Sequence, residues 1–168
     1  MLVLIIGLIA YRFLAVPELP ENSDDKIVTV LSSDVPEFIK GETGYVTNDG
    51  IKIWYESILP SDTIKGAILL FMGISNDAMG WPQPFVDNLV QSGYQVIRYD
   101  YRGTGFLDWA INWKDNPYSL EDLAKDSKVI IDSLIIDKVN LVGISLGGMV
   151  AQEQLDSTID LLPQRVKI

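Results

Sequence analysis

The chain has 168 residues, of which 48% are apolar and 21% charged, with a formal net charge of −10 and a pI of about 4.3. This composition indicates a globular protein with one domain and a sizeable core, not a disordered chain. The acidic balance argues against a nucleic-acid partner, because phosphate binding needs a basic surface. Cysteine and histidine are both absent, which excludes disulfides, thiol catalysis and the usual transition-metal ligands. We therefore expect no metal and no cofactor.

The sequence divides into three unequal parts, of which the first is almost wholly apolar. Residues 1–16 contain Arg12 as their only charge, and we interpret them as a membrane anchor or signal-anchor. A signal peptide and a helix packed on the domain are the alternatives, because 16 helical residues span about 24 Å, less than the roughly 30 Å hydrocarbon core. The interpretation predicts a membrane-associated protein with a single N-terminal anchor, although Arg12 does not decide on which side the domain lies. The polar, acidic residues 17–42, with three prolines, are predicted to be a linker.

From residue 43 to residue 168, strand-like and helix-like segments alternate. A hairpin is predicted over residues 45–55, with Asn48-Asp49-Gly50 as its turn. Apolar runs predict buried strands, and amphipathic patterns with capping residues predict helices. Further strands are expected at 67–72, 95–99, 138–142 and from 164 onward, and helices at 82–91, 119–134 and from 148 onward. The alternation predicts an α/β fold with a mostly parallel sheet and helices on both faces.

The segment Gly143-Ile144-Ser145-Leu146-Gly147 joins a predicted strand to a predicted helix, which is typical of a nucleophile elbow. Gly143 and Gly147 would be needed because a side chain two residues either side of Ser145 would collide with the neighbouring strand or helix. The alternative is an ordinary tight turn with an incidental serine. A serine hydroxyl is a weak nucleophile that needs an adjacent base, and this chain has no histidine to serve as one.

Three motifs, Met72-Gly73-Ile74, Asp100-Tyr101-Arg102-Gly103-Thr104-Gly105 and the elbow, occur in the order and spacing of the α/β-hydrolase fold. The chain most resembles the aclacinomycin-methylesterase-like carboxylic ester hydrolases, which carry Met-Gly in place of His-Gly and a Trp-Pro soon after it, here Trp81-Pro82. The resemblance covers residues 43–168 and corresponds to only the N-terminal half or so of such a domain. It implies a C-terminally incomplete domain, because the family supplies its acid and histidine further along the chain.

The resemblance implies a serine hydrolase that acts on a small-molecule ester or amide. Ser145 would attack the acyl carbon, and the backbone N–H groups of Ile74 and Leu146 would form the oxyanion hole. Gly73 would let the backbone approach the substrate. Met72 and Trp81 are possible pocket residues, with simple packing as the alternative. The motif that begins at Asp100 is interpreted as structural.

Two other kinds of function stay open. A proline-iminopeptidase-like aminopeptidase or a cofactor-free haloperoxidase would share Ser145 and the fold. A non-catalytic, membrane-tethered fragment or pseudoenzyme belongs to a different class, and the absence of histidine favours it for this chain. The chain as given is expected to be inactive or severely impaired as an esterase.

Overall fold

The computed structural model describes residues 11–12, 23–32, 38–106 and 117–159. Its contacts divide the chain into two units, Met1–Glu37 and Phe38–Ile168. Apart from residues 11 and 12, the predicted anchor lies outside the described residues, and so does the strand expected from residue 164. In the described ranges, none of the helices has the length and apolar character needed to cross a membrane.

The first unit contains helix α2, Ser23–Ser32, within the segment predicted to be a linker. The sequence analysis expected no regular structure there. Two features of the segment explain the helix. Asp24 and Asp25 lie in its first turn, where negative charge is favourable to the helix dipole, and no proline occurs between Pro20 and Pro36.

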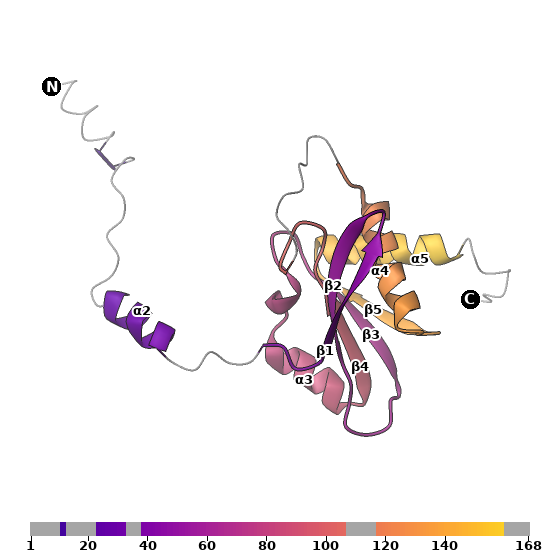
Figure 1. Cartoon of the computed structure of the whole chain (residues 1–168), viewed down its shortest axis with the longest axis horizontal. Coiled ribbons are helices and arrows are strands. Elements are labelled where there is room, and N and C mark those ends of the chain that lie inside the picture. Colours follow the sequence, from indigo (N-terminus) through magenta and orange to yellow (C-terminus); the bar gives the residue numbers. More distant parts are fainter. Residues whose placement is uncertain (1–10, 13–22, 33–37, 107–116, 160–168) are drawn as a thin grey trace. The chain divides into compact units, whose positions relative to one another are not determined.

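The second unit is built on a five-stranded sheet with the strand order β1-β2-β4-β3-β5. The three strands β3, β4 and β5 are parallel to one another (Figure 1). Strand β2 runs antiparallel to both of its neighbours, β1 and β4, so the sheet is mixed. The strands are β1 Glu42–Asn48, β2 Ile51–Ile58, β3 Gly66–Phe71, β4 Tyr94–Tyr99 and β5 Val139–Gly143. The predicted hairpin is β1–β2, and its turn residues Asp49 and Gly50 have φ of +48° and +76°. Such left-handed turns match the twist of the two strands, which is why Asp-Gly is favoured here.

The helices begin and end close to where local sequence predicts. They are α3 Gln83–Gln91, α4 Leu120–Ser133 and α5 Leu146–Ile159, with a short 3-10 turn, η1, at Ala78–Gly80. Ser119 caps α4 and forms a reciprocal capping box with Asp122, so two backbone N–H groups of the first turn have acceptors. Gly93 follows α3 with φ of +94°, a conformation that glycine adopts at low cost.

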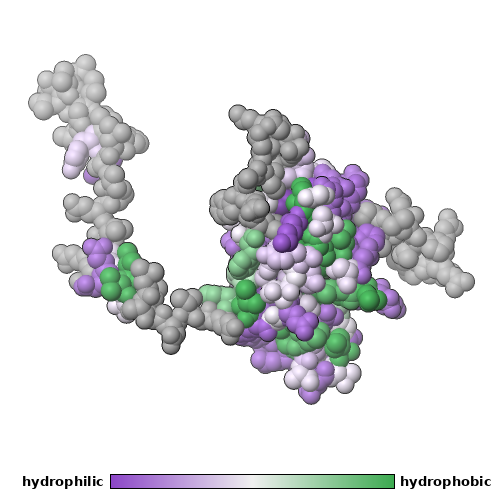
Figure 2. Space-filling view, in the orientation of Figure 1, coloured by the Kyte–Doolittle hydropathy of each residue, from purple (hydrophilic) through white to green (hydrophobic). Residues whose placement is uncertain are grey.

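Side chains of the buried strands alternate between two hydrophobic layers, which confirms that helices cover both faces. Leu69 and Phe71 of β3 pack in a cluster with residues of α4 and α5, including Val150. Leu70 points the other way and packs in a cluster with Val86 of α3. This period of two follows from strand geometry. On the face shown in Figure 2, hydrophobic side chains that remain at the surface are interspersed with hydrophilic ones.

A fully buried ion pair joins β2 to β4 on the α3 side of the sheet. Glu56 and Arg98 are cross-strand partners, and the Nε of Arg98 donates to the carboxylate of Glu56. The other carboxylate oxygen accepts the backbone N–H groups of Lys40 and Gly41, and Arg98 also donates to the carbonyl of Phe38. The pair therefore holds residues 38–41, where the second unit begins, against the sheet.

We expect Glu56→Ala to lower the free energy of unfolding by about 3–5 kcal/mol, because it leaves the buried Arg98 charge without its partner. Urea unfolding followed by circular dichroism measures the change. Glu121→Ala is the control, because Glu121 forms an exposed pair with Lys125 and should leave stability almost unchanged. Equal losses in the two variants would contradict a structural role for the buried pair.

Candidate active site

Ser145 lies on the turn between β5 and α5, where the elbow pattern predicts it. Its φ is +55°, a left-handed conformation that is uncommon for a residue with a side chain, and the residue is exposed. The turn is closed by short backbone bonds: the N–H of Gly147 donates to the carbonyl of Ile144 and that of Gly148 to the carbonyl of Ser145, both at 2.9 Å. The fold therefore presents the serine side chain at the carboxyl end of the sheet.

The two elbow glycines are needed for close backbone packing. A β-carbon added to Gly143 would lie 2.4 Å from the carbonyl oxygen of Gly147. One added to Gly147 would lie 2.0 Å from the carbonyl oxygen of Phe71, the last residue of β3. Both distances are far inside van der Waals contact. The first turn of α5 thus rests directly on the end of β3.

The segment after β3 lies next to the serine. A β-carbon added to Gly73 would be 3.5 Å from the β-carbon of Ser145, and Gly73 itself is buried. Within the described part of the chain, neither the N–H of Ile74 nor that of Leu146 donates a hydrogen bond. Leu146 is the first residue of α5, where an N–H has no partner inside the helix. Both amides are thus available as donors, and their role in an oxyanion hole remains a prediction.

The structure places Met72 and Trp81 in the hydrophobic layer beneath α3. Each is 9% exposed, and Val86 belongs to the same cluster. The Trp81 ring stacks on Phe85 with 5.4 Å between the ring centroids. These contacts are those of packing residues. Their proposed part in a substrate pocket remains a prediction.

The motif that follows β4 ties loops together, as interpreted. Asp100 is fully buried, and burial raises the pKa of its carboxyl group. The carboxylate accepts hydrogen bonds from the backbone N–H groups of Ala78 and Phe106, and these bonds lower that pKa. Arg102 forms a two-point ion pair with Asp126 of α4 at 2.6 and 2.7 Å. The hydrogen bond from Arg102 to Asp126 raises the pKa of the guanidinium.

Asp126 was missed by the sequence analysis. It is fully buried and also accepts a hydrogen bond from Asn48 at 2.8 Å, which connects α4 to the β1–β2 turn. The spacing along α4 could have indicated that Asp126 is buried. Asp126 lies three residues after Leu123 and four before Ile130, on the apolar face of the helix. An acidic residue at such a position usually has a buried cationic partner.

In the described residues no general base reaches Ser145. The chain has no histidine, and the hydrogen bonds of the described residues include none from the Ser145 hydroxyl to a carboxylate. The same residues contain no group of carboxylates that could hold a metal ion. Among the described residues, the surroundings of Ser145 therefore contain two backbone amides that are free to donate, but no proton acceptor for its hydroxyl.

A cavity of about 470 Å³ lies elsewhere, between α4, α5 and the free edge of β5. It is lined by Lys138 and Val139 at the start of β5, whereas Ser145 follows the end of that strand. Gln154 and Leu155 of α5 complete its wall. The cavity therefore lies toward the start of β5 and not at the Ser145 end.

The comparisons with known proteins agree with this geometry. A family model described as the alpha/beta hydrolase fold matches residues 66–167, more than half of the chain. The chain belongs to the α/β hydrolase fold family. This confirms the predicted fold class and the family resemblance.

The relatives of this chain include two proteins named as methylesterases. The chain is 35% identical over 113 residues to rhodomycin D methylesterase of Streptomyces peucetius, which covers 66% of this chain and 36% of the relative. The same enzyme of Streptomyces strain C5 is 34% identical over 113 residues with the same coverage. This chain therefore spans just over a third of the length of these relatives, in agreement with the expected partial domain.

Solved structures show the same fold. An N-acyl homoserine lactone degrading enzyme superposes with a TM-score of 0.55 at 31% identity, covering 68% of this chain and 41% of that one. An epoxide hydrolase of Vigna radiata superposes with a TM-score of 0.58 at 23% identity, covering 70% and 36%. At 23% identity, the likeness to the epoxide hydrolase shows a shared fold and not a shared reaction.

Gly147→Ala is expected to lower the free energy of unfolding by about 1–3 kcal/mol, because its methyl group would overlap the Phe71 carbonyl. Gly148→Ala is the matched control one residue away, where an added β-carbon meets nothing nearer than 3.7 Å. That variant should be neutral or more stable by up to about 1 kcal/mol, because alanine favours the helix. Chemical denaturation of both variants measures the difference. Similar midpoints for the two would contradict the tight contact between α5 and β3.

Proposed function

We propose that this chain carries the nucleophile and the oxyanion hole of a serine carboxylic ester hydrolase. The observation that supports this best is the exposed, left-handed Ser145 at the end of β5, with Gly73 of the neighbouring segment next to it. A strained serine at such a position has a cost that packing alone does not explain. The likeness to two methylesterases makes an ester the preferred substrate over an amide.

In the proposed reaction the Ser145 Oγ attacks the acyl carbon and its proton passes to a base. The carbonyl oxygen becomes an oxyanion, which accepts hydrogen bonds from the N–H groups of Ile74 and Leu146. The intermediate then collapses: the C–O bond to the alcohol breaks, and the base returns the proton to the leaving alkoxide. Water repeats the sequence on the acyl-serine and releases the acid. Two backbone donors lower the activation free energy most when they meet charge that develops only in the transition state.

We propose that the base comes from outside these 168 residues, because the chain contains no histidine. We infer that the histidine and the acid belong to a further part of the catalytic domain. The matched segment is 36% of the length of the methylesterases, which are therefore long enough to hold such groups beyond it. This chain would then supply the attacking and oxyanion-stabilising half of the site.

The surroundings of the serine favour an apolar substrate. Ile74, Ile144 and Met149 lie within four residues of Ser145 or on the neighbouring segment, and their exposed fractions are 70%, 53% and 53%. Large apolar side chains grouped at the surface often mark a ligand site. We propose a small-molecule ester with an apolar acyl portion.

For the chain alone we expect little turnover of p-nitrophenyl acetate, because Ser145 has no base. Oxyanion stabilisation and binding can still leave a rate roughly 10³-fold above that in water. Ser145→Ala should remove the part that depends on the nucleophile. Rapid turnover that this substitution abolishes would mean that an aspartate or glutamate acts as base, or that two chains share a site.

A chimera gives the complementary test. It consists of residues 38–159 of this chain followed by the corresponding remainder of the Streptomyces peucetius methylesterase. We expect the chimera to hydrolyse the ester and to be labelled by a fluorophosphonate, and its Ser145→Ala form to do neither. A chimera that is folded by circular dichroism but unlabelled would refute the proposed nucleophile. Hydrolysis of prolyl p-nitroanilide in preference to esters would favour the aminopeptidase alternative.

We also propose that residues 1–16 attach the protein to a membrane, on the basis of their nearly continuous apolar sequence. Deleting them should move the protein from the membrane fraction to the soluble fraction after cell lysis. A carbonate wash of the full chain separates an inserted segment from adsorbed protein. Equal retention of the full and the shortened chain would refute the anchor.

A further inference from the structure

Two consecutive residues after β4 hold the residues on either side of one short segment. This segment comprises residues 73–77, and we call it the site loop. The two consecutive residues are Asp100 and Tyr101, and their side chains point to opposite faces of the sheet, as neighbours in an extended segment do. Tyr101 lies in the cluster with α4 and α5. Asp100 accepts the backbone N–H groups of Ala78 in η1 and of Phe106.

Tyr101 holds the residue that precedes the site loop. Its hydroxyl donates a 2.9 Å hydrogen bond to the carbonyl oxygen of Met72, in a buried position. Burial raises the pKa of Tyr101, so the hydroxyl stays protonated and acts as a donor. The same Met72 oxygen lies 2.7 Å from where a β-carbon on Gly147 would be. Because the peptide unit is planar, fixing this carbonyl also fixes the direction of the Gly73 N–H.

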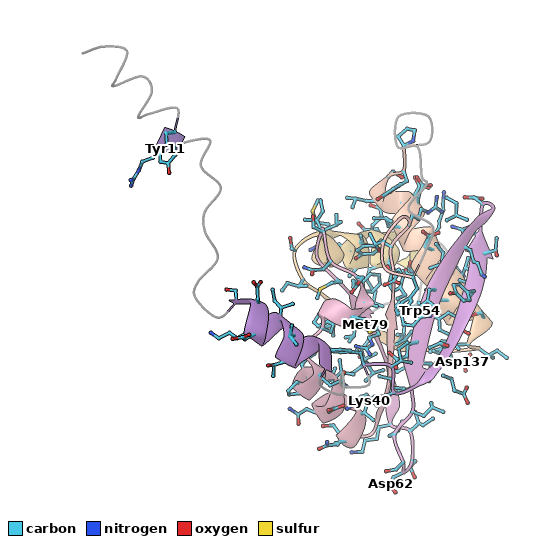
Figure 3. The ribbon with its side chains drawn as sticks, turned by 60° about the vertical axis from the view of Figure 1, so that its left-hand side comes forward. Tyr11, Lys40, Trp54, Asp62, Met79 and Asp137 are labelled. Atoms are coloured by element: carbon cyan, nitrogen blue, oxygen red, sulfur yellow. The ribbon has the colours of Figure 1, made fainter. Side chains whose placement is uncertain are left out.

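Asp100 holds the residue that follows the site loop. Its carboxylate accepts the N–H of Ala78 at 2.8 Å, and its second oxygen accepts the N–H of Phe106 at 2.8 Å. Ala78 packs in a small buried cluster with Trp54 and Met79, which Figure 3 labels. The backbone N–H of Asp100 donates to the carbonyl of Trp54, so Asp100 itself is tied to β2.

The conformation of the site loop needs such support. Ser75 has φ of +65°, a left-handed conformation for a residue with a side chain. A strained residue of this kind persists only when its surroundings determine it. Ser75 and Ile74 are both exposed, so the site loop receives little support from side-chain packing of its own. Its constraints are the cap that Asp77 forms on η1 and the two buried hydrogen bonds that Tyr101 and Asp100 make at its ends.

We propose that Tyr101 and Asp100 are positioning residues, which hold the two ends of the site loop and thereby set the direction of the Ile74 N–H. Oxyanion binding by the Ile74 N–H rests on the proposed function, whereas the restraint of the site loop does not. Neither residue touches the substrate in this proposal. Both act through the backbone of residues 72–78.

Nuclear magnetic resonance on the full 168-residue chain tests the proposal with Tyr101→Phe, which removes the hydroxyl and keeps the ring. We expect the carbonyl ¹³C resonance of Met72 to move upfield as its hydrogen bond is lost. Backbone order parameters of residues 73–76 should fall from the rigid value of about 0.85 to below about 0.6. Resonances of α3 should stay in place, which would show that the chain is folded.

Tyr99→Phe is the matched control. Tyr99 is equally buried and packs edge-on against Tyr101 at 5.4 Å, but the Met72 carbonyl accepts its hydrogen bond from Tyr101 and not from Tyr99. This variant should leave Met72 and the site loop unchanged. Site-loop order parameters in Tyr101→Phe that equal those in Tyr99→Phe would overturn the role of Tyr101.

Asp100→Asn tests the other end of the site loop, because an amide can accept from only one of the two N–H groups and turns its NH₂ toward the other. The amides of Ala78 and Phe106 should shift, and hydrogen exchange of at least one should become faster. Unchanged exchange at both would overturn the role of Asp100. These measurements do not depend on esterase activity, so an inactive chimera would refute the proposed function without deciding the restraint of the loop.

Discussion

The contact between the first turn of α5 and the carboxyl end of β3 is the constraint on which the site depends. A β-carbon on Gly147 would lie 2.0 Å from the Phe71 carbonyl and 2.7 Å from the Met72 carbonyl, so only glycine fits. This single contact places two things at once: the elbow with Ser145, and the backbone that leads into Gly73. Because protein interiors are packed as densely as crystals, this contact between two backbones leaves neither the start of α5 nor the end of β3 free to shift.

Buried carboxylates hold the remaining loops around this contact. Glu56 fixes residues 38–41, Asp100 joins η1 to the loop before Phe106, and Asp126 connects Arg102 to the β1–β2 turn. Each carboxylate accepts at least two hydrogen bonds from backbone or side-chain N–H groups. A buried charge without such partners would be strongly destabilising, so these residues specify one arrangement of the loops. Apart from Arg98 in β4 and Asn48 at the end of β1, their partners lie outside the strands, where the chain leaves the regular hydrogen-bonding of the sheet.

In the proposed function, the site that results supplies one half of a catalytic arrangement. Membership of the α/β hydrolase fold family establishes the architecture, but folds of this kind support many reactions, so function has to be argued from the site. In the proposed function Ser145 would attack the acyl carbon, and the amides of Ile74 and Leu146 would bind the oxyanion. The proton acceptor is a separate requirement, and no side chain of this chain is a histidine that could meet it. The two halves can therefore be tested independently.

Local chemistry explains what the sequence by itself determined. The Asp49-Gly50 turn, the capping box of Ser119 and Asp122, and the glycines of the elbow each depend on residues within a few positions of one another, so their structures followed from sequence. The strand order β1-β2-β4-β3-β5 and the burial of Asp126 against Asn48, 78 residues away, were decided by packing of the whole domain. The hydrogen bond from Tyr101 to Met72 has the same origin, because no local pattern says where a buried hydroxyl will find its acceptor. Helix α2 was missed because the polar, acidic composition of its segment suits an extended chain as well as a helix.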